Sequence, residues 1–353
     1  MLKRGLCALI ACVLVLGLCT CGAAAETVGN AQAAMNAANR LCRRHLLATD
    51  GSIITIRDTS YQQVAAGYVQ LDGLKKLCRP MGELNTYALT ESGELYDGAE
   101  KIASGVEDLV FSTTSNAPEG FLITADGIRR IYDNVISGID YTSEFVRPEG
   151  GDQAAVSAPI YIGVDNHTFL ALDESGRVFV NKSATNRYDD LVGMGVFDWE
   201  NLAMVAIALY GTETMTVAGI QKDVTVVAAG DYAEEILDWG SLSYLAMSDG
   251  TIIGLTADGS LKLTGQDAEM IRSSVESRTG IAAVEVCRSK IGALVTAVDT
   301  NGDFRFIYVN HNAVEGEGRV TLEDGSESET CFRYAPDGTL TRSCDNGGWT
   351  PVD

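Results

Sequence analysis

The side chains in this chain that could do chemistry stand in no recognised catalytic spacing. The three histidines, His45, His167 and His311, have no second His or Cys at the spacing of a metal site. The sequence has no G-x-S-x-G elbow, no H-E-x-x-H motif and no phosphate-binding glycine loop. We therefore expect no metal, no cofactor and no catalysis. An enzyme site converging from distant segments, for example a carbohydrate-active one, leaves no such spacing and stays open as the alternative.

Two elements of similar sequence, VFDWENLAMVAIA (196–208) and ILDWGSLSYLAMS (236–248), carry the candidate binding residues. Each runs from apolar residues through Asp-Trp into an apolar strand. Each Trp fits either packing at the entry to a strand or an exposed binding surface, and packing is the more usual role of a periodic aromatic. The tyrosine before ILDW is expected to be exposed, next to two acids. The candidates are Tyr232, Glu234, Glu235, Trp199 and Trp239.

The cysteines divide between the first residues of the chain and the rest. Four of the nine lie within residues 1–25, and the five that follow are an odd number, so at least one is unpaired within the chain. Cys331 and Cys344 flank CFRYAPDGTLTRSC, which has the pattern of a hairpin, and a disulfide between them is predicted. Cys42–Cys78 is a weaker pairing, and Cys287 fits a small buried residue.

The N-terminus has the features of a secretory signal peptide. Lys3 and Arg4 precede an apolar stretch from 6 to 18, which ends before Ala23-Ala24-Ala25. We predict cleavage after Ala25 and a secreted, extracellular protein. A lipoprotein anchored through Cys21 is the alternative. No other run is long and apolar enough for a membrane-spanning helix, so none is expected.

The chain is strongly acidic. Its 26 basic and 48 acidic residues give a net charge of −22, and loss of Lys3 and Arg4 with the signal peptide makes it −24. Such a chain is unsuited to nucleic acid or an anionic membrane. The charge fits either simple solubility or an acidic face for a basic partner, to which the pairs Asp189-Asp190 and Glu234-Glu235 would contribute.

The same hairpin pattern recurs along the chain. An apolar run, a short turn with Gly and a second apolar run occur with turns at Gly51, Gly93, Gly127, Gly176, Val224, Gly259 and Gly302, and again at Gly338. The first seven turns are spaced about 42 residues apart on average, the period of one four-stranded propeller blade. The prediction is an all-β fold, a closed β-propeller of seven blades, with six or eight as alternatives.

These units resemble the regulator of chromosome condensation repeat in a divergent exported bacterial form. The segment 213–265, ETMTVAGIQKDVTVVAAGDYAEEILDWGSLSYLAMSDGTIIGLTADGSLKLTG, carries the resemblance best, although Val224 stands where the repeat has Gly. Gly127 and Gly259 are expected at positive φ, and the turn at Val224 is expected to have a different geometry, such as one more residue. The resemblance implies a seven-bladed propeller. Its exported members resemble binding scaffolds, and the chromatin role of the eukaryotic founder does not fit this acidic chain.

The sequence thus divides into a signal peptide (1–25), a tether or short helix (26–44), the propeller repeats (45–313) and a last segment (314–353). That segment is expected to supply ring-closing strands or a small stapled appendage. The predicted function is an exported, monomeric scaffold that binds another protein or a cell-surface polymer through loops on one rim.

Overall fold

The protein, described by a computed structural model, is mostly antiparallel β-sheet with few and short helices, as the sequence predicts. No helix within the described ranges is long and apolar enough to cross a membrane. The predicted signal peptide, Cys21 and residues 26–40 lie outside those ranges. The structure describes residues 41–42, 45–47, 53–57, 60–63, 73–78, 87–98, 100–112, 119–132, 135–165, 167–211, 214–248, 250–266, 268–276, 278–289, 292–300, 303–308, 330–334, 340–344 and 350–351.

The described strands form seven sheets, numbered here sheet 1 to sheet 7 in chain order. The first three have four strands each, in simple up-and-down order. Sheet 1 has β1 (Leu41–Cys42), β2 (His45–Leu47), β3 (Ile53–Arg57) and β4 (Ser60–Gln63). Sheet 2 has β5 (Leu74–Cys78), β6 (Tyr87–Thr90), β7 (Leu95–Asp97) and β8 (Glu100–Ala103). Sheet 3 has β9 (Val106–Phe111), β10 (Glu119–Thr124), β11 (Gly127–Tyr132) and β12 (Val135–Asp140).

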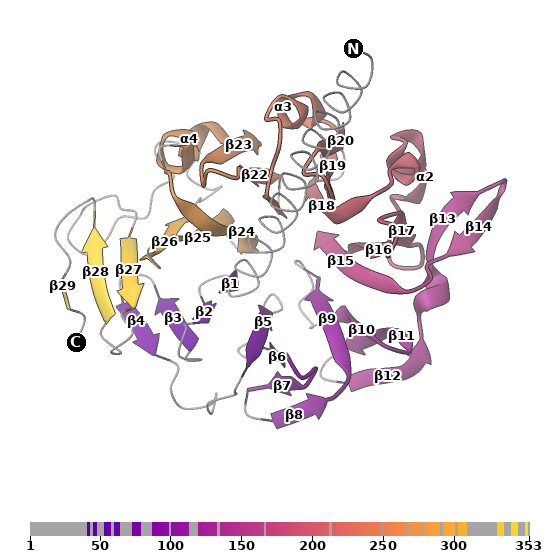
Figure 1. The fold of residues 1–353 in the computed structure, drawn as a ribbon, viewed down its shortest axis with the longest axis horizontal. Coiled ribbons are helices and arrows are strands. Elements are labelled where there is room, and N and C mark those ends of the chain that lie inside the picture. Colours follow the sequence, from indigo (N-terminus) through magenta and orange to yellow (C-terminus); the bar gives the residue numbers. More distant parts are fainter. Residues whose placement is uncertain are drawn as a thin grey trace, which may run out of the picture.

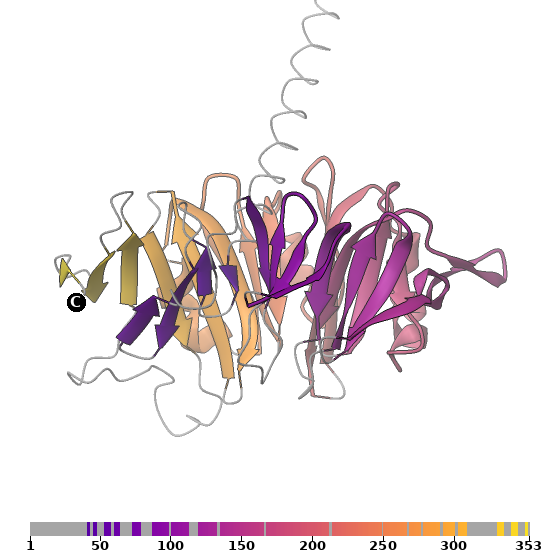
Figure 2. The same ribbon diagram turned by 90° about the horizontal axis from the view of Figure 1, so that it is seen from below.

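Sheets 4, 5 and 6 differ in width. Sheet 4, in the order β14-β13-β17-β16-β15, has β13 (Phe145–Glu149), β14 (Asp152–Ala155), β15 (Pro159–Asp165), β16 (Thr168–Asp173) and β17 (Val178–Asn181). Sheet 5 has β18 (Leu202–Tyr210), β19 (Thr214–Gln221) and β20 (Val226–Gly230). Sheet 6 has β21 (Tyr244–Ser248), β22 (Thr251–Leu255) and β23 (Leu261–Gly265). The β13–β14 hairpin projects outward from the rest in both ribbon views (Figures 1 and 2).

Sheet 7 includes the last segment of the chain. Because β27 pairs with β26, the described part of segment 314–353 extends sheet 7 instead of pairing with sheet 1. In the register of β27 and β28, Cys331 is opposite Ser343 and Cys344 is opposite Thr330, and the disulfide stays a prediction. The strands are β24 (Ile281–Ser289), β25 (Gly292–Asp299), β26 (Asp303–Tyr308), β27 (Thr330–Tyr334), β28 (Leu340–Cys344) and β29 (Thr350–Pro351).

The sheets stand around a common centre (Figure 1). One strand of each sheet lies innermost, and each innermost strand contacts the next: β5 contacts β9, then β15, β18, β21 and β24 follow in turn. The short strand β1 contacts both β24 and β5. The strands run across the thickness of the molecule when it is seen from the side (Figure 2).

Short helices connect sheets 4 to 7. α2 (Tyr188–Gly193) and the 3-10 turn η2 (Val196–Asp198) lead into sheet 5, α3 (Ala233–Leu237) into sheet 6 and α4 (Ala268–Glu276) into sheet 7. A second 3-10 turn, η1 (Thr142–Glu144), precedes β13. α3 packs on β20 and α4 packs on β23, so both outer edges are covered.

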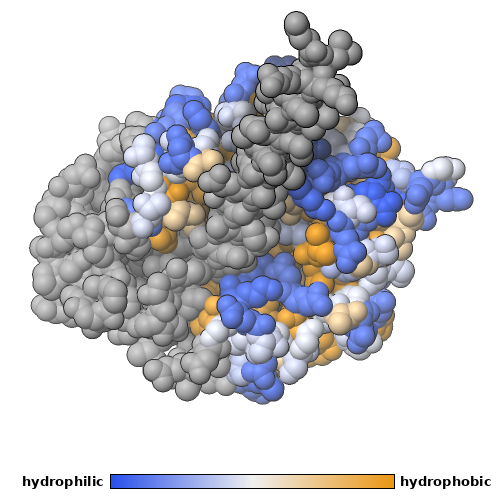
Figure 3. All heavy atoms as spheres, viewed as in Figure 1, coloured by the Kyte–Doolittle hydropathy of each residue, from blue (hydrophilic) through white to orange (hydrophobic). Residues whose placement is uncertain are grey.

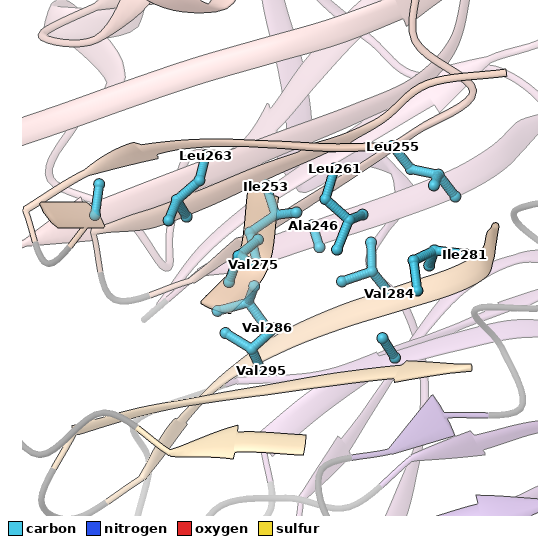
Figure 4. Close-up of a cluster of buried hydrophobic side chains, with 12 residues drawn as sticks. Ala246, Ile253, Leu255, Leu261, Leu263, Val275, Ile281, Val284, Val286 and Val295 are labelled. Carbon is cyan, nitrogen blue, oxygen red and sulfur yellow. The ribbon is translucent and has the colours of Figure 1, made fainter. Parts of the chain in front are cut away.

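Apolar cores fill the spaces between successive sheets from sheet 2 to sheet 7. Figure 4 shows the core between sheets 6 and 7, where Leu261 faces Val284, and Val275 of α4 lies beside Val286. Because sheets 3 to 6 each contribute to two of these cores, these sheets are apolar on both faces and must stack on their neighbours to be stable. This explains why the sequence pattern repeats.

Every predicted hairpin is present as a pair of hydrogen-bonded strands. The first seven lie in seven different sheets, and the eighth extends sheet 7. Gly127 and Gly259 have φ of 122° and 79°, as expected for these turns. The turns at Gly51, Gly302 and Gly338 lie outside the described residues.

The expectation of a different turn geometry at Val224 is wrong. Its φ is 65°, in the left-handed region that β-branched residues rarely enter. Its N–H donates to Gln221 O (2.9 Å), as Gly259 N–H donates to Thr256 O (3.0 Å). Its carbonyl accepts the N–H of Leu242 (3.3 Å), just as Gly259 O accepts that of Ile281 (2.9 Å). The contact with the next sheet therefore imposes the same turn on both residues.

Candidate functional site

The predicted binding residues Trp199 and Trp239 lie in two separate places. Both are half-buried and follow the linker that leads into a sheet. Trp199 packs on the core between sheets 4 and 5, and Trp239 on the core between sheets 5 and 6. A Cβ added at Gly254 would lie 2.8 Å from Trp239, so this ring packs closely on β22. Both rings therefore have the packing contacts expected of a periodic aromatic.

Tyr232, Glu234 and Glu235 come together on α3, but they are not equally exposed. Tyr232 is half-buried against the core between sheets 5 and 6, which corrects the expectation of an exposed ring. The Thr264 hydroxyl donates to the Glu235 carboxylate, so that acid is bonded to β23 of sheet 6. Glu234 is exposed. Glu235 is exposed as well, so both acids, but not the tyrosine, have the surface position that the sequence prediction gave to the group.

The linker helices α2 and α3 present equivalent residues. Leu191 and Ile236 are fully buried, and their N–H groups donate to the carbonyls of Arg187 (3.1 Å) and Tyr232 (3.2 Å). The next residue on each helix is an exposed aliphatic, Val192 at 43% exposure and Leu237 at 49%. Each pair follows two acids, Asp189-Asp190 or Glu234-Glu235. We call this repeated feature, formed by Asp189, Asp190, Val192, Glu234, Glu235 and Leu237, the acidic rim.

The two halves of the acidic rim differ in how their charge is balanced. On α2, Arg187 Nε lies 3.2 Å from Asp190 Oδ2, which offsets one carboxylate. On α3 an uncharged Tyr232 occupies the position of Arg187. Acids also flank both linkers, including Asp198, Glu200, Asp231 and Asp238, all exposed. Hydrophilic residues predominate over α2 on the face in Figure 3, and apolar residues reach the surface nearer the centre.

A second group of polar side chains lies at the centre, where the innermost strands share a β-bulge. In β5, β9, β15, β18 and β24, the first and third residues oppose consecutive residues of the partner strand, so one extra residue is inserted. Bulges re-aim the side chains that follow them and are common beside functional sites. The extra residues are Lys75, Glu107, Ile160, Ala203 and Ala282.

The residue after each bulge forms one layer around the centre. Tyr244 of β21 occupies the equivalent position. Leu242, two residues before it, donates its N–H to the turn carbonyl of sheet 5, just as Ile281, two residues before Ala283, donates to the turn carbonyl of sheet 6. Cys78 and Glu285 follow two residues later on strands whose layer residues are Lys76 and Ala283. The layer consists of Lys76, Asp108, Tyr161, Met204, Tyr244 and Ala283.

An ion pair joins sheets 2 and 3 within this layer. Lys76 Nζ and Asp108 Oδ1 are 2.7 Å apart, with 16% and 19% of their side chains exposed. Asp108 Oδ1 also accepts the N–H of Leu109 (2.8 Å). One step along, Cys78 Sγ lies 3.7 Å from Leu109 O. Two sheets are thus held together by polar contacts that keep some access to solvent.

Burial and neighbouring charges shift the pKa values of the titratable side chains in and beside this layer. Burial alone lowers the pKa of Lys76, but Asp108 and Cys78 favour the ammonium and the pKa is raised overall. Burial raises the pKa of the Cys78 thiol to about 12, against the opposing effect of Lys76. Burial, with the charge of Asp108, raises the pKa of Tyr161. Burial raises the pKa of Tyr244, and the charges of Tyr161 and Glu285 raise it further. At neutral pH the thiol and both phenols are therefore protonated and can donate.

Sequence reasoning missed this central polar cluster, which we define as Lys76, Cys78, Asp108, Tyr161, Tyr244 and Glu285. Its members are distant in sequence and share only their place after the start of an innermost strand, as in GLKKLC and GVEDLVF. Aligning the strand starts would have revealed the layer. No group of His, Cys, Asp and Glu within the described ranges has a metal-binding arrangement.

Comparison with known proteins gives solved β-propeller structures but no family. No family model and no curated protein matches the chain. The chain is similar to Saccharomyces cerevisiae Prp20p (11% identity, TM-score 0.30, covering 77% of this chain and 72% of that one). It is also similar to BBS1N from its complex with ARL6DN (10%, 0.35, 74% and 76%) and to KlHsv2 with a replaced loop (8%, 0.36, 86% and 96%). Values this low transfer no partner or residue role, and the condensation-repeat assignment stays a prediction.

Proposed function

We propose that this protein is a seven-bladed, closed β-propeller that binds a basic protein through the acidic rim. Closure is supported by the contacts of β1 with both β5 and β24, and the count by the seven described sheets. In this proposal the chain is exported, through the signal peptide or anchored at Cys21, acts as a monomer, and does no catalysis.

The observation that carries the binding proposal is the repeat of an exposed aliphatic beside two acids on adjacent linkers. A single exposed apolar residue is ordinary, but Val192 and Leu237 occupy equivalent positions on α2 and α3. Burying such residues in a complex supplies affinity, whereas the surrounding carboxylates select a basic partner and speed encounter. Their spacing on successive sheets suits a partner that contacts both linkers.

The test is a matched pull-down from the extracellular fluid of the native source. The variant Val192→Asp/Leu237→Asp removes both apolar contacts, and Val135→Asp is the control, because Val135 is 70% exposed on the distant strand β12. A basic protein retained by the wild type and the control, lost with the double variant and released by salt supports the proposal. Equal retention by all three proteins contradicts it.

Kinetics with the purified partner separate the two contributions. Glu234→Lys should slow association several-fold at low salt with little effect on dissociation, since exposed charges act mainly on encounter. Leu237→Ala should instead speed dissociation. An association rate indifferent to salt would remove the electrostatic part of the proposal.

A further inference from the structure

The central polar cluster is a built feature of the fold, separate from the acidic rim. Its members come from β5, β9, β15, β21 and β24, and four of them occupy the same layer after a shared bulge or its equivalent. An apolar residue at this position is enough for two sheets to pack together. Sheets 5 and 7 have one there, the buried Met204 and Ala283. Polar residues in the other four sheets therefore exceed what stacking requires.

The cluster is not fully closed to solvent, because the Lys76 and Asp108 side chains are 16% and 19% exposed. All of its residues are half-buried, and Tyr161 and Tyr244 also pack against the cores between sheets 4 and 7. Lys76 uses one of its three donors on Asp108 Oδ1, and among the described residues no group donates to Asp108 Oδ2. The protonated hydroxyls of Tyr161 and Tyr244 supply further donors. Donors and acceptors from several sheets thus lie around one region.

The charges and apolar surface around the central polar cluster limit which ligands it would bind. The bulge residues Lys75 and Glu107 add one charge of each sign beside the Lys76–Asp108 pair, and Lys75 Nζ donates to Glu107 O (2.7 Å). This balance, with Glu285 nearby, is unsuited to a phosphate or another strong anion. Ile160, next to Tyr161 on β15, adds exposed apolar surface.

We propose that the central polar cluster binds a neutral sugar, whose hydroxyls meet Asp108, Lys76 and the tyrosine hydroxyls and whose C–H face lies on Ile160 and the tyrosine rings. A neutral polyhydroxyl ligand matches a site that has both donors and acceptors, little net charge and apolar surface. A phosphorylated sugar would bring uncompensated charge next to Glu285. A metal is unsuited, because the described residues provide no ligand group for one.

The experiment is saturation-transfer NMR on the mature protein with glucose, galactose and N-acetylglucosamine at about 10 mM, with glucose 6-phosphate alongside. Binding of at least one neutral sugar is expected, with glucose 6-phosphate weaker. Tyr244→Phe removes one hydroxyl and keeps the ring, and Asp108→Asn keeps the shape of the acceptor. At least one of these should weaken binding about five-fold, the value of one hydrogen bond.

Tyr188→Phe is the matched control, because Tyr188 lies at the start of α2, away from the centre. It should bind sugar as the wild type does, as should Val192→Asp/Leu237→Asp, which separates this proposal from rim binding. Thermal melting checks that each variant is folded. Absence of signal from every neutral sugar, tighter binding of glucose 6-phosphate, or unchanged binding in both Tyr244→Phe and Asp108→Asn would overturn the proposal.

Discussion

Sheets 5 and 6 are near copies that differ at one turn. Both have three strands, a linker helix and an Asp-Trp entry, and both turn carbonyls bind the N–H of a residue that leads into the next sheet. Sheet 6 has Gly259 at the turn, where left-handed backbone is free of strain, and sheet 5 has Val224. The comparison teaches that the contact between sheets determines the turn, and that a residue unsuited to it is tolerated where space allows.

The largest effect that tests this comparison is expected from Gly259→Val. A Cβ there would lie 2.8 Å from Ile281 N and 2.9 Å from Gly280 Cα, in addition to the left-handed backbone. We expect a loss of about 4 kcal/mol in the free energy of unfolding, measured by denaturant titration. Gly98→Val is the control, because Gly98 has φ of 59° and no atom within 4 Å of an added Cβ, and it should lose only about 1–2 kcal/mol. Equal losses would show that backbone strain, not contact with sheet 7, dominates.

Trp239→Ala should have the next largest effect. The ring packs on the core between sheets 5 and 6 and against Gly254, and its removal should cost about 3 kcal/mol. Trp199→Ala, at the equivalent place before sheet 5, is the comparison and should cost a similar amount. A loss under about 1 kcal/mol in either variant, by thermal or chemical unfolding, would point to a surface role for that ring.

Val224→Gly is expected to change stability by less than about 1 kcal/mol, because two effects oppose each other. Glycine relieves about 1–2 kcal/mol of left-handed strain, and loss of the buried Val side chain removes a similar amount. Calorimetry of this variant beside Gly259→Val would measure the asymmetry directly. A loss above about 2 kcal/mol would mean that the Val224 side chain, and not the backbone contact, holds the turn.

Leu237→Asp should have the smallest effect on stability, a few tenths of a kcal/mol, since the side chain is about half exposed. Val192→Asp on α2 should behave alike, because the two positions are equivalent. Both melting temperatures should stay within a few degrees of the wild type. A large drop in one of them would show that the two linkers are not equivalent after all.

The sequence predicts the hairpins well, because their signals are local. Turn residues such as Asp258-Gly259 and alternating apolar runs specify each strand pair without reference to the rest of the chain. Val224 was misjudged for the opposite reason, since its conformation is set by Leu242 of the next sheet. Tyr232 was expected on the surface because a loop of acids surrounds it, yet its ring reaches the neighbouring core.

The central polar cluster could not be predicted from spacing. Lys76 and Asp108 are 32 residues apart, and their contact depends on bulges that shift each innermost strand by one residue. Such a shift reverses which face a side chain takes, and turn residues do not encode it. Sheets arranged around a common centre bring together residues that are far apart in the sequence, so the centre is the part of the fold that is hardest to predict from the sequence.

The outer edges of the sheets decide where this architecture can grow. Sheets 5 and 6 are closed at three strands by α3 and α4, whereas sheet 4 accepts β13 and β14 and sheet 7 accepts β27 to β29 at the outside. Additions at the outside leave the innermost strands and the apolar cores untouched. An engineer who inserts a new recognition loop should therefore use the β13–β14 hairpin, where the extra sequence lies at the periphery and the packing of the innermost strands is preserved.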